Sequence, residues 1–238
     1  MRTIAFVSQK GGSGKSTIAS SVAVAARQTN EKVCVIDMDP QGSLTNWARL
    51  RAAGDIEVLA SGAARLPALL AALERRGVTL ALLDTPGAEG AASSAAMRVA
   101  DLNIVPSRPS LFDLRASARA RAALEEIGAK FVFLLNQCPP AQTARVQDGV
   151  EALEEMGALI SPLILARVDY QDAARRGRGV TELNPSGAAA QEMRGLWQSI
   201  TIRLAEAKIG RLAKRGLGLG QTNIGSPAQA LVPALEMA

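Results

Sequence analysis

Short apolar runs alternate along this chain with longer segments in which apolar residues recur every three or four positions. A continuous apolar run of about four to eight residues fits a strand buried on both faces of a parallel sheet, and the longer periodic segments fit helices. Strands are predicted at residues 4–7, 32–36, 56–59, 78–83, 102–105, 130–135 and 163–165. Helices are predicted at 17–28, 66–75, 90–99, 111–127, 146–156 and 187–208, around Trp47, and as a short helix or turn at 172–178. The alternation predicts an α/β fold, a mainly parallel twisted sheet with helices on both faces.

The composition refines this picture. Of the 238 residues, 48% are hydrophobic and 3% are aromatic, so the core is expected to consist of Ala, Leu, Val and Ile. This length fits one α/β domain. From Ile209 onward glycines and prolines become frequent, and the start of this stretch is basic. We therefore predict a folded domain over residues 1–208 and a flexible basic tail rich in glycine and proline over residues 209–238.

The charge and the reactive residue types limit the function. The 27 Lys and Arg residues against 22 Asp and Glu give a formal net charge of +5. This excess fits a polyanionic partner, either nucleic acid or an anionic membrane surface, and equally a mildly basic soluble protein. The absence of histidine removes the commonest general base and metal ligand. Cys34 and Cys138 lie far apart in or beside apolar runs, as buried free thiols would. Without a membrane-spanning run or a signal-peptide segment, the protein is predicted to be cytoplasmic.

A glycine-rich segment, SQKGGSGKST, occupies residues 8–17 between the first predicted strand and the first predicted helix. The glycines leave backbone N–H groups free to converge on phosphate oxygens, and the helix N-terminus adds a partial positive charge. This strand–turn–helix arrangement is the pattern of a phosphate-binding loop, in which Lys15 would neutralise the β- and γ-phosphates and Ser16 would bind Mg²⁺. Two residues depart from the general pattern: Gln9 replaces a glycine, and a second lysine, Lys10, stands at the front of the loop.

Aspartates follow two of the predicted strands. Asp84 comes directly after residues 78–83, where a carboxylate can reach the Mg²⁺ shell, although it could also serve as a turn or capping residue. Asp37 and Asp39 follow residues 32–36. Because the chain has no histidine, a carboxylate is the obvious group to orient an attacking water. Such a group need only position the water, because phosphoryl transfer proceeds mostly by alignment and charge stabilisation. One of the two could instead cap the following turn.

Three segments together resemble the deviant-Walker ATPases of the ParA/MinD superfamily: KGGSGKST at 10–17, DMDPQGS at 37–43 and LLDTPG at 82–87. The second segment is most similar to that of the ParA-type partition ATPases. The resemblance implies Mg²⁺-dependent hydrolysis of ATP by a P-loop domain. It assigns catalytic roles to Lys10, Lys15 and Asp39. It assigns nucleotide binding to Lys10, Gly11, Gly12, Ser13, Gly14, Lys15, Ser16, Thr17 and Asn136. It places Ser16, Asp37 and Asp84 at or near the metal.

The resemblance also implies a homodimer. Lys10 matches the signature lysine, which in this family reaches across an ATP-sandwich dimer to the partner's nucleotide, so that hydrolysis times dissociation. Asn136 resembles the asparagine that reads the adenine edge, and a turn asparagine before two prolines is the alternative. Residues 166–170 are a candidate for the other wall of the adenine pocket.

For the partition branch, the resemblance implies that the dimer binds double-stranded DNA without sequence preference and is therefore nucleoid-associated. A centromere-binding adaptor protein would stimulate hydrolysis, and because residue 1 directly precedes the first strand, operator reading is expected to belong to such a partner. The candidate DNA contacts are Arg167, Arg175, Arg176, Arg178, Arg203, Lys208, Arg211, Lys214 and Arg215.

The alternative is a MinD-like membrane-cycling ATPase. Residues 200–212 alternate between basic and apolar side chains, as an amphipathic helix lying on anionic lipid would. A relative of the nitrogenase iron protein would need cluster-ligating cysteines after the third motif, and none lies between Asp84 and Asn136.

Overall fold

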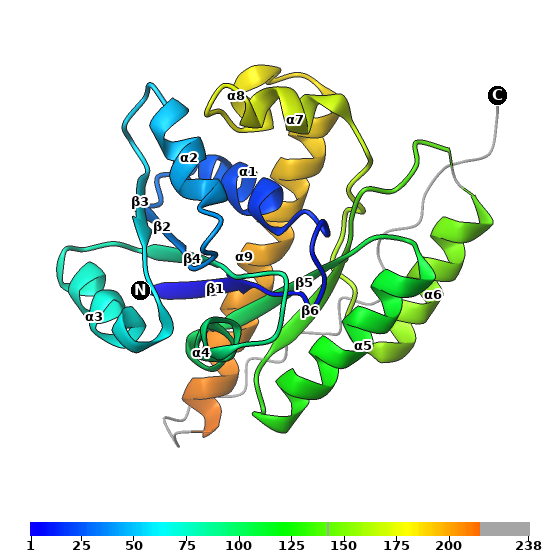
Figure 1. Cartoon of the computed structure of the whole chain (residues 1–238), viewed down its shortest axis with the longest axis horizontal. Coiled ribbons are helices and arrows are strands. Elements are labelled where there is room, and N and C mark those ends of the chain that lie inside the picture. The colour runs from blue at the N-terminus through cyan, green and yellow to red at the C-terminus, as the bar shows by residue number, and fades with distance from the viewer. Residues whose placement is uncertain (142, 215–238) are drawn as a thin grey trace.

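The computed structural model describes residues 1–141 and 143–214, with side chains described as far as residue 206. Its centre is a six-stranded sheet in which all neighbours are parallel, in the order β3-β2-β4-β1-β5-β6 (Figure 1). The strands are β1 (Arg2–Phe6), β2 (Val33–Asp37), β3 (Glu57–Ala60), β4 (Leu80–Asp84), β5 (Leu102–Ser107) and β6 (Phe131–Leu135). Every residue of β2, β4 and β5 is buried, as central strands covered on both faces must be.

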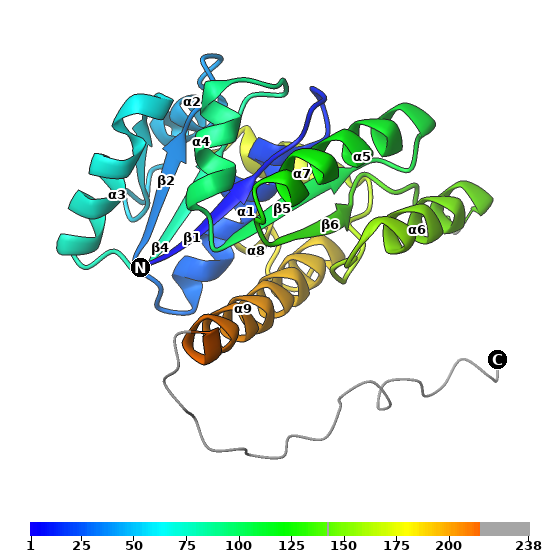
Figure 2. The same cartoon turned by 90° about the horizontal axis from the view of Figure 1, so that it is seen from below.

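Helices cover both faces of the sheet (Figures 1 and 2). One face carries α1 (Lys15–Gln28), α2 (Ser43–Leu50), α7 (Val168–Ala174), α8 (Val180–Leu183) and α9 (Ala188–Lys214). The other face carries α3 (Leu66–Arg75), preceded by the 3₁₀ turn η1 (Ala63–Arg65), and α4 (Ala91–Val99), α5 (Leu111–Glu126) and α6 (Ala144–Met156). The predicted α/β fold with a parallel sheet is therefore confirmed.

Small side chains allow close packing on the first face. Ala19, Ala23 and Ala26 of α1 are fully buried, so the backbone of this helix lies near the sheet. Trp197 of α9 closes this layer, and its Nε1 donates a hydrogen bond to Thr29 Oγ1 at 2.9 Å, directly after α1. The core thus rests mainly on aliphatic residues, as the composition predicts.

The carboxyl ends of three strands meet at one edge of the sheet. Asp84 lies in register with Phe6 of β1 on one side and with Asp37 of β2 on the other. The Thr85 hydroxyl donates to the Phe6 carbonyl at 2.8 Å, which ties the turn after β4 to the end of β1. The loops after β1, β2 and β4 are thereby brought together, which is where ligands of parallel sheets bind.

The predicted last strand, residues 163–165, does not form. After α6 the chain returns to the edge strand β6 but makes only isolated bridges there, Leu159 with Phe133 of β6 and Leu165 with Cys138 beyond it. Pro162 lies between the two bridges and has no backbone N–H to donate to a ladder. The prediction of a seventh strand is therefore wrong.

The C-terminal helix continues to Lys214 rather than ending at residue 208. Residues 209–214 are thus helical, and the rest of the predicted tail, 215–238, lies outside the described residues. In place of a single short helix at 172–178, α7 ends at Ala174 and α8 begins at Val180. Within the described ranges, no helix combines the length and the apolar character needed to cross a membrane.

Candidate nucleotide-binding site

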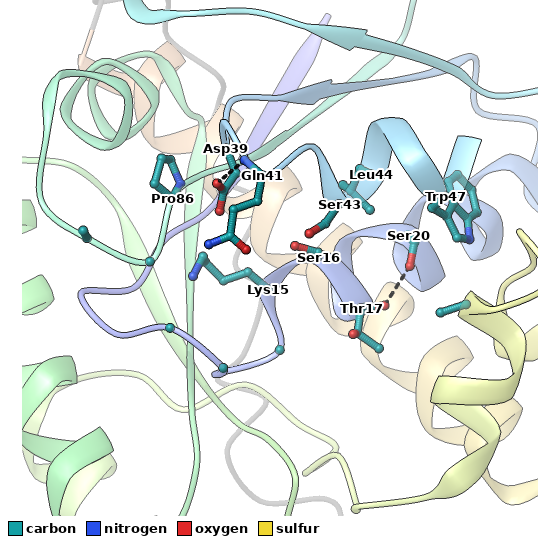
Figure 3. A pocket seen from close by; sticks show the side chains of 16 residues that line it. Lys15, Ser16, Thr17, Ser20, Asp39, Gln41, Ser43, Leu44, Trp47 and Pro86 are labelled. Carbon is teal, nitrogen blue, oxygen red and sulfur yellow. Dashed lines mark hydrogen bonds between the residues drawn. The ribbon is translucent and has the colours of Figure 1, made fainter. Parts of the chain in front are cut away.

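The phosphate loop joins β1 to α1, as the sequence predicts (Figure 3). Gly12 and Gly14 have φ values of +78° and +90°, a left-handed backbone that favours glycine. Gly14 is the N-cap of α1 and supplies no side-chain hydrogen bond, so the first N–H groups of this helix remain available to a ligand. An anion placed here would also meet the positive end of the helix dipole.

A cavity of about 580 Å³ opens above this loop. Its walls are the loop itself, the segment that runs from β2 into α2, the turn after β4, and one residue of α7. The lining residues are Gly11, Gly12, Gly14, Lys15, Ser16, Thr17, Ser20, Asp39, Gln41, Ser43, Leu44, Trp47, Pro86, Gly87, Ala88 and Ala174. Most of the predicted phosphate-binding residues and Asp39 therefore share one cavity, the nucleotide cavity. Figure 3 shows Lys15, Asp39 and Gln41 close together in it.

Lys15 is the buried cation of the nucleotide cavity, with 6% of the residue exposed. Burial lowers the pKa of Lys15, and the nearby carboxylates of Asp84 and Asp39 act in the opposite direction. A phosphate in the cavity would add negative charge beside this ammonium and so favour its charged form.

Ser16 and Asp84, two of the residues predicted to lie at the metal, are in contact. The Ser16 hydroxyl donates to Asp84 Oδ2 at 2.5 Å, and Asp84 Oδ1 is buried without a hydrogen-bond partner among the described residues. Burial raises the pKa of Asp84 to about 7, against the opposing effects of the Ser16 hydrogen bond and the Lys15 charge. A buried, unsatisfied carboxylate oxygen beside a hydroxyl is the oxygen-donor environment that Mg²⁺ prefers. These residues therefore fit a magnesium ion.

Asp37 and Asp39 have different environments although they are two residues apart. Asp37 is buried, and its Oδ2 accepts hydrogen bonds from the Thr45 N–H at 2.8 Å and the Thr45 hydroxyl at 2.9 Å. Its Oδ1 accepts the Asp39 N–H at 3.2 Å. Asp37 thus holds the start of α2, whereas Asp39 lines the nucleotide cavity and accepts the Gln41 N–H at 2.9 Å. Asp37, like Asp84, is not among the lining residues, but both of its oxygens already accept hydrogen bonds from the segment that leads into α2 and from the first turn of this helix.

Asn136 follows β6 and lies against the phosphate loop. Its Nδ2 donates to the Ser13 carbonyl at 2.8 Å, and the neighbouring Gln137 Nε2 donates to the Gly12 carbonyl at 3.1 Å. A Cβ at Gly14 would stand 2.4 Å from Asn136 Nδ2, so this approach needs glycine. Beyond Gln137 a second cavity of about 560 Å³ includes Ala166, from the segment predicted to form the other wall of the adenine pocket. Whether Asn136 reads an adenine edge stays a prediction.

Lys10 lies at the front of the loop but does not line the nucleotide cavity. Its Nζ donates to Asp113 Oδ2 at 2.6 Å, and Arg108 Nε donates to Asp113 Oδ1 at 3.0 Å. Sequence reasoning missed both Asp113 and Arg108. The available signal was the spacing Ser110-x-x-Asp113 after a predicted strand, which is typical of a helix N-terminus.

The predicted DNA contacts have different surroundings. Arg175, Arg176 and Arg178 are exposed and lie at and just beyond the end of α7. Arg167 is half-buried, and its Nε donates to Glu192 Oε1 at 2.7 Å. Arg203 lies 3.4 Å from Glu206 on α9. The side chains of the remaining candidates are outside the described set: Lys208, Arg211, Lys214 and Arg215.

Comparison with known proteins decides the family. The model of the CobQ/CobB/MinD/ParA nucleotide-binding domain matches residues 4–180, which include the phosphate loop and Asp84. The chain belongs to this family.

Curated relatives of the chain are positioning and partition proteins. The maintenance of carboxysome distribution protein A of Gloeobacter kilaueensis is 31% identical over 218 residues, which cover 90% of this chain and 93% of that protein. The chromosome-partitioning ATPase Soj of Thermus thermophilus is 25% identical over 244 residues, covering 87% of this chain and 98% of Soj. The chain is therefore a ParA/MinD-type ATPase that is similar to positioning and partition proteins. Its cofactors are ATP and Mg²⁺, in agreement with the Mg-ADP and ATP complexes of family structures.

Solved structures agree on the fold. The cell division ATPase MinD of Pyrococcus furiosus superposes with a TM-score of 0.68 at 19% identity and covers 84% of this chain and 98% of that one. An ATP complex of a Cyanothece McdA variant superposes with a TM-score of 0.69 at 18% identity, covering 86% of this chain and 96% of that one. At this level of identity the likeness shows the shared P-loop architecture.

Proposed function

We propose that this ATPase positions cargo by cycling on DNA: two subunits sandwich ATP, the dimer binds double-stranded DNA without sequence preference, and hydrolysis releases it. A partner protein bound to the cargo stimulates the hydrolysis. For plasmid or chromosome partition that partner is a centromere-binding adaptor, and the ATPase is nucleoid-associated in the cytoplasm.

The position of Lys10 carries this proposal. The lysine belongs to the phosphate loop, yet its ammonium lies beside α5 and outside the nucleotide cavity of its own subunit. A cation so placed is open to a phosphate of a second subunit that faces this surface. A cation supplied across a dimer neutralises charge in the transition state as an arginine finger does, and it makes ATP part of the dimer interface.

The residues of the nucleotide cavity take distinct roles in this proposal. Backbone N–H groups of the loop and the Lys15 ammonium hold the phosphates, and the Thr17 hydroxyl adds a contact. Ser16 and Asp84 hold Mg²⁺, with Asp37 acting through the loop that it orders. Asp39 orients the attacking water. When bound, Mg²⁺ would neutralise negative charge on the phosphates. Water is positioned and charge is stabilised, which is most of what phosphoryl transfer requires.

The exposed arginines after α7 support the DNA step. Arg175 has 75% of its side chain exposed, and its nearest carboxylate, on Asp172, is 3.7 Å away. Its chain neighbour Ala174 lines the nucleotide cavity, so this basic segment begins where the cavity wall ends. Such side chains bind phosphates of the duplex backbone and read no sequence.

The helix after Asp39 connects the nucleotide cavity to the same segment. Trp47 of α2 lines the cavity, and its Nε1 donates to the Arg178 carbonyl at 3.2 Å. Arg51, directly after α2, donates to the Gly177 carbonyl at 3.1 Å. A shift of α2 on nucleotide binding would therefore move the basic segment, which gives ATP a direct influence on DNA binding.

Two other readings remain as alternatives to be tested. A MinD-like enzyme would bind an anionic membrane through the C-terminal part of the chain, which the basic and apolar alternation of residues 200–212 favours. The relatives named for carboxysome distribution favour a protein assembly, rather than a replicon, as the cargo.

Retention on plain duplex DNA and on anionic liposomes, each with ATP, ADP or no nucleotide, tests the proposal. We expect the protein to be retained on DNA with ATP but not with ADP or without nucleotide. The amount retained should fall steeply as the salt concentration rises. Replacing Arg175, Arg176 and Arg178 by Gln should reduce the slope of log K against log salt by about one unit per lost phosphate contact.

A matched control removes three exposed arginines from the opposite face of the sheet. Arg65, Arg75 and Arg98 are all exposed, and their replacement by Gln changes the net charge equally. The control should keep the DNA affinity and the salt slope of the parent. Retention on liposomes but not on DNA would instead support the membrane alternative. A Lys10→Ala protein that dimerises with ATP and hydrolyses it at the parental rate would refute the role of this lysine in the dimer.

A further inference from the structure

The Lys10 ammonium is held by a buried acceptor in the single subunit. Its Nζ lies 2.6 Å from Asp113 Oδ2 and 5.9 Å from the centroid of the Phe112 ring. The Asp113 side chain is 1% exposed and the Lys10 side chain 31% exposed. The lysine therefore has a defined place in the free subunit, at the start of α5.

Asp113 would stay paired if Lys10 left. Arg108 Nε donates to its Oδ1 at 3.0 Å, and the Ser110 hydroxyl donates to its Oδ2. Burial opposes ionisation of Asp113, but the hydrogen bonds from Lys10, Ser110 and Arg108 outweigh it and hold the pKa of this carboxyl below its ordinary value. Removing the partner of a buried carboxylate is strongly destabilising when no other counter-ion remains beside the charge. Here Arg108 remains as the counter-ion, so the release of Lys10 leaves no buried charge uncompensated.

A lysine paired with Asp113 offers little free charge to a phosphate, because the carboxylate already neutralises it. Beside the pair, Leu111 and Phe112 are 60% and 69% exposed, which puts two large apolar side chains on the surface around the ammonium. An exposed apolar surface next to a cation suits contact with another subunit.

We propose that Asp113 is a positioning residue: its ion pair with Lys10 restrains the lysine in the free subunit. When a second copy of this chain binds, the pair breaks and Lys10 contacts the nucleotide of that second copy. This inference rests on the proposed function, since it assumes that Lys10 acts across a dimer. The contact with Asp113 is lost on dimerisation, so it favours the free subunit and sets the ATP and protein concentrations at which dimers form.

The test is a double-mutant cycle on the full chain with Mg²⁺ and a non-hydrolysable ATP analogue, read as the dimer dissociation constant by analytical ultracentrifugation. Asp113→Asn keeps the shape of the side chain and removes its charge. We expect it to lower the dissociation constant by about tenfold, the range of one hydrogen bond to a charged group. Lys10→Ala should dimerise more weakly than the parent, so its dissociation constant is read at higher protein concentration. In that background the same change should have no effect, because a residue that acts only through Lys10 shows full coupling to it.

Glu125→Gln is the matched control, because it removes one negative charge from the exposed end of α5, where Glu125 pairs with Arg121. It should leave the dissociation constant unchanged. An Asp113→Asn protein that dimerises less readily than the parent, or equally, overturns the proposal. So does an equal gain in the Lys10→Ala background, which would show an effect unrelated to the lysine.

A measurement on the free subunit separates this inference from the proposed function. Acetic anhydride labels lysine amines, and mass spectrometry gives the rate at Lys10 without nucleotide. We expect labelling of Lys10 to be at least about threefold faster in Asp113→Asn and unchanged in Glu125→Gln, because the amine is no longer held by a carboxylate. An unchanged rate overturns the restraint even if dimers form. If the parent protein does not dimerise with ATP, while the labelling of Lys10 is still faster in Asp113→Asn, the proposed function is refuted and the restraint is not.

Discussion

Gly87, in the turn after β4, lies directly against Gly11 of the phosphate loop. A Cβ on Gly87 would stand 2.8 Å from Gly11 Cα and 2.9 Å from its backbone nitrogen, closer than real Cβ atoms approach backbone. The turn that follows Asp84 and the phosphate loop are therefore in backbone contact. A change in one must displace the other, which couples the two motifs mechanically.

Gly87→Ala should weaken nucleotide binding while the protein stays folded. The added methyl group meets backbone on the phosphate loop, so the loop has to shift from the geometry that its N–H groups need for phosphate. We expect the ATP dissociation constant to rise by about tenfold or more, measured by calorimetry, with a melting temperature close to that of the parent. Gly90→Ala is the control, since a Cβ there has nothing within 4 Å and its backbone is extended. Equal ATP affinity in the two variants would contradict this account.

Asp84→Asn should weaken the binding of Mg²⁺ and so lower the rate of ATP hydrolysis. The substitution keeps a partner for the Ser16 hydroxyl, which lies 2.5 Å from Asp84 Oδ2, but it removes the negative charge. Removing a side chain that supports a bound metal typically costs about 10–100-fold in metal affinity or activity. Titration of hydrolysis with Mg²⁺ should therefore show a higher half-saturating concentration and a lower maximal rate. Hydrolysis that saturates at the same Mg²⁺ concentration as the parent would argue against a metal at this site.

The parts of the structure that local patterns determine could be predicted from the sequence. The phosphate loop joins a buried strand to an alanine-rich helix, so its strand–turn–helix form depends on neighbouring residues alone. The strand that failed, at 163–165, is an apolar run like the others. Its neighbour Pro162 prevents continuous pairing, and only the position of β6 shows which N–H groups would have been needed.

Contacts between distant segments could not be predicted. Lys10 and Asp113 are 103 positions apart, and nothing in either local sequence names the other as its partner. Asp37 shows the same limit, because the sequence left open whether it faces the metal or the turn. The structure shows that Thr45, one turn into α2, takes up its carboxylate. The role of a side chain in such a loop depends on which distant segment packs against the loop, and that is known only from the folded structure.

Asn136→Ala should loosen the phosphate loop. The amide nitrogen of Asn136 is a hydrogen-bond partner of the buried Ser13 carbonyl, and its loss leaves that acceptor unsatisfied. Affinity for ATP and for GTP should therefore fall together, by about tenfold. Gln137→Ala removes a similar bond to the exposed Gly12 and should have a smaller effect. A fall confined to ATP would show instead that the asparagine reads the base.

Arg51 provides a stability prediction that depends on pH. Its guanidinium, with the side chain 3% exposed, donates to Glu182 Oε1 at 2.8 Å and Oε2 at 2.9 Å, and to Asp55 Oδ1 at 2.8 Å. Burial alone would raise the pKa of Glu182 and of Asp55, but the hydrogen bonds from Arg51 outweigh it and lower both. Carboxyls whose pKa is lower in the folded than in the unfolded protein stabilise the fold above their unfolded pKa, which is about 4 for these groups.

Arg51→Met should therefore destabilise the protein most at neutral pH. Two partly buried carboxylates lose their partner, and breaking such a pair costs about 3 kcal/mol. As the pH falls through the lowered pKa values, both carboxyls become protonated in the parent and its advantage disappears. The difference in unfolding free energy between parent and variant, measured by urea denaturation, should thus be largest at pH 7 and should shrink as the pH falls below about 4. Arg49→Met, on the exposed side of the same helix, should change little at either pH. A difference that stays constant with pH would mean that Arg51 stabilises the fold by packing on Trp47 and not through its carboxylate partners.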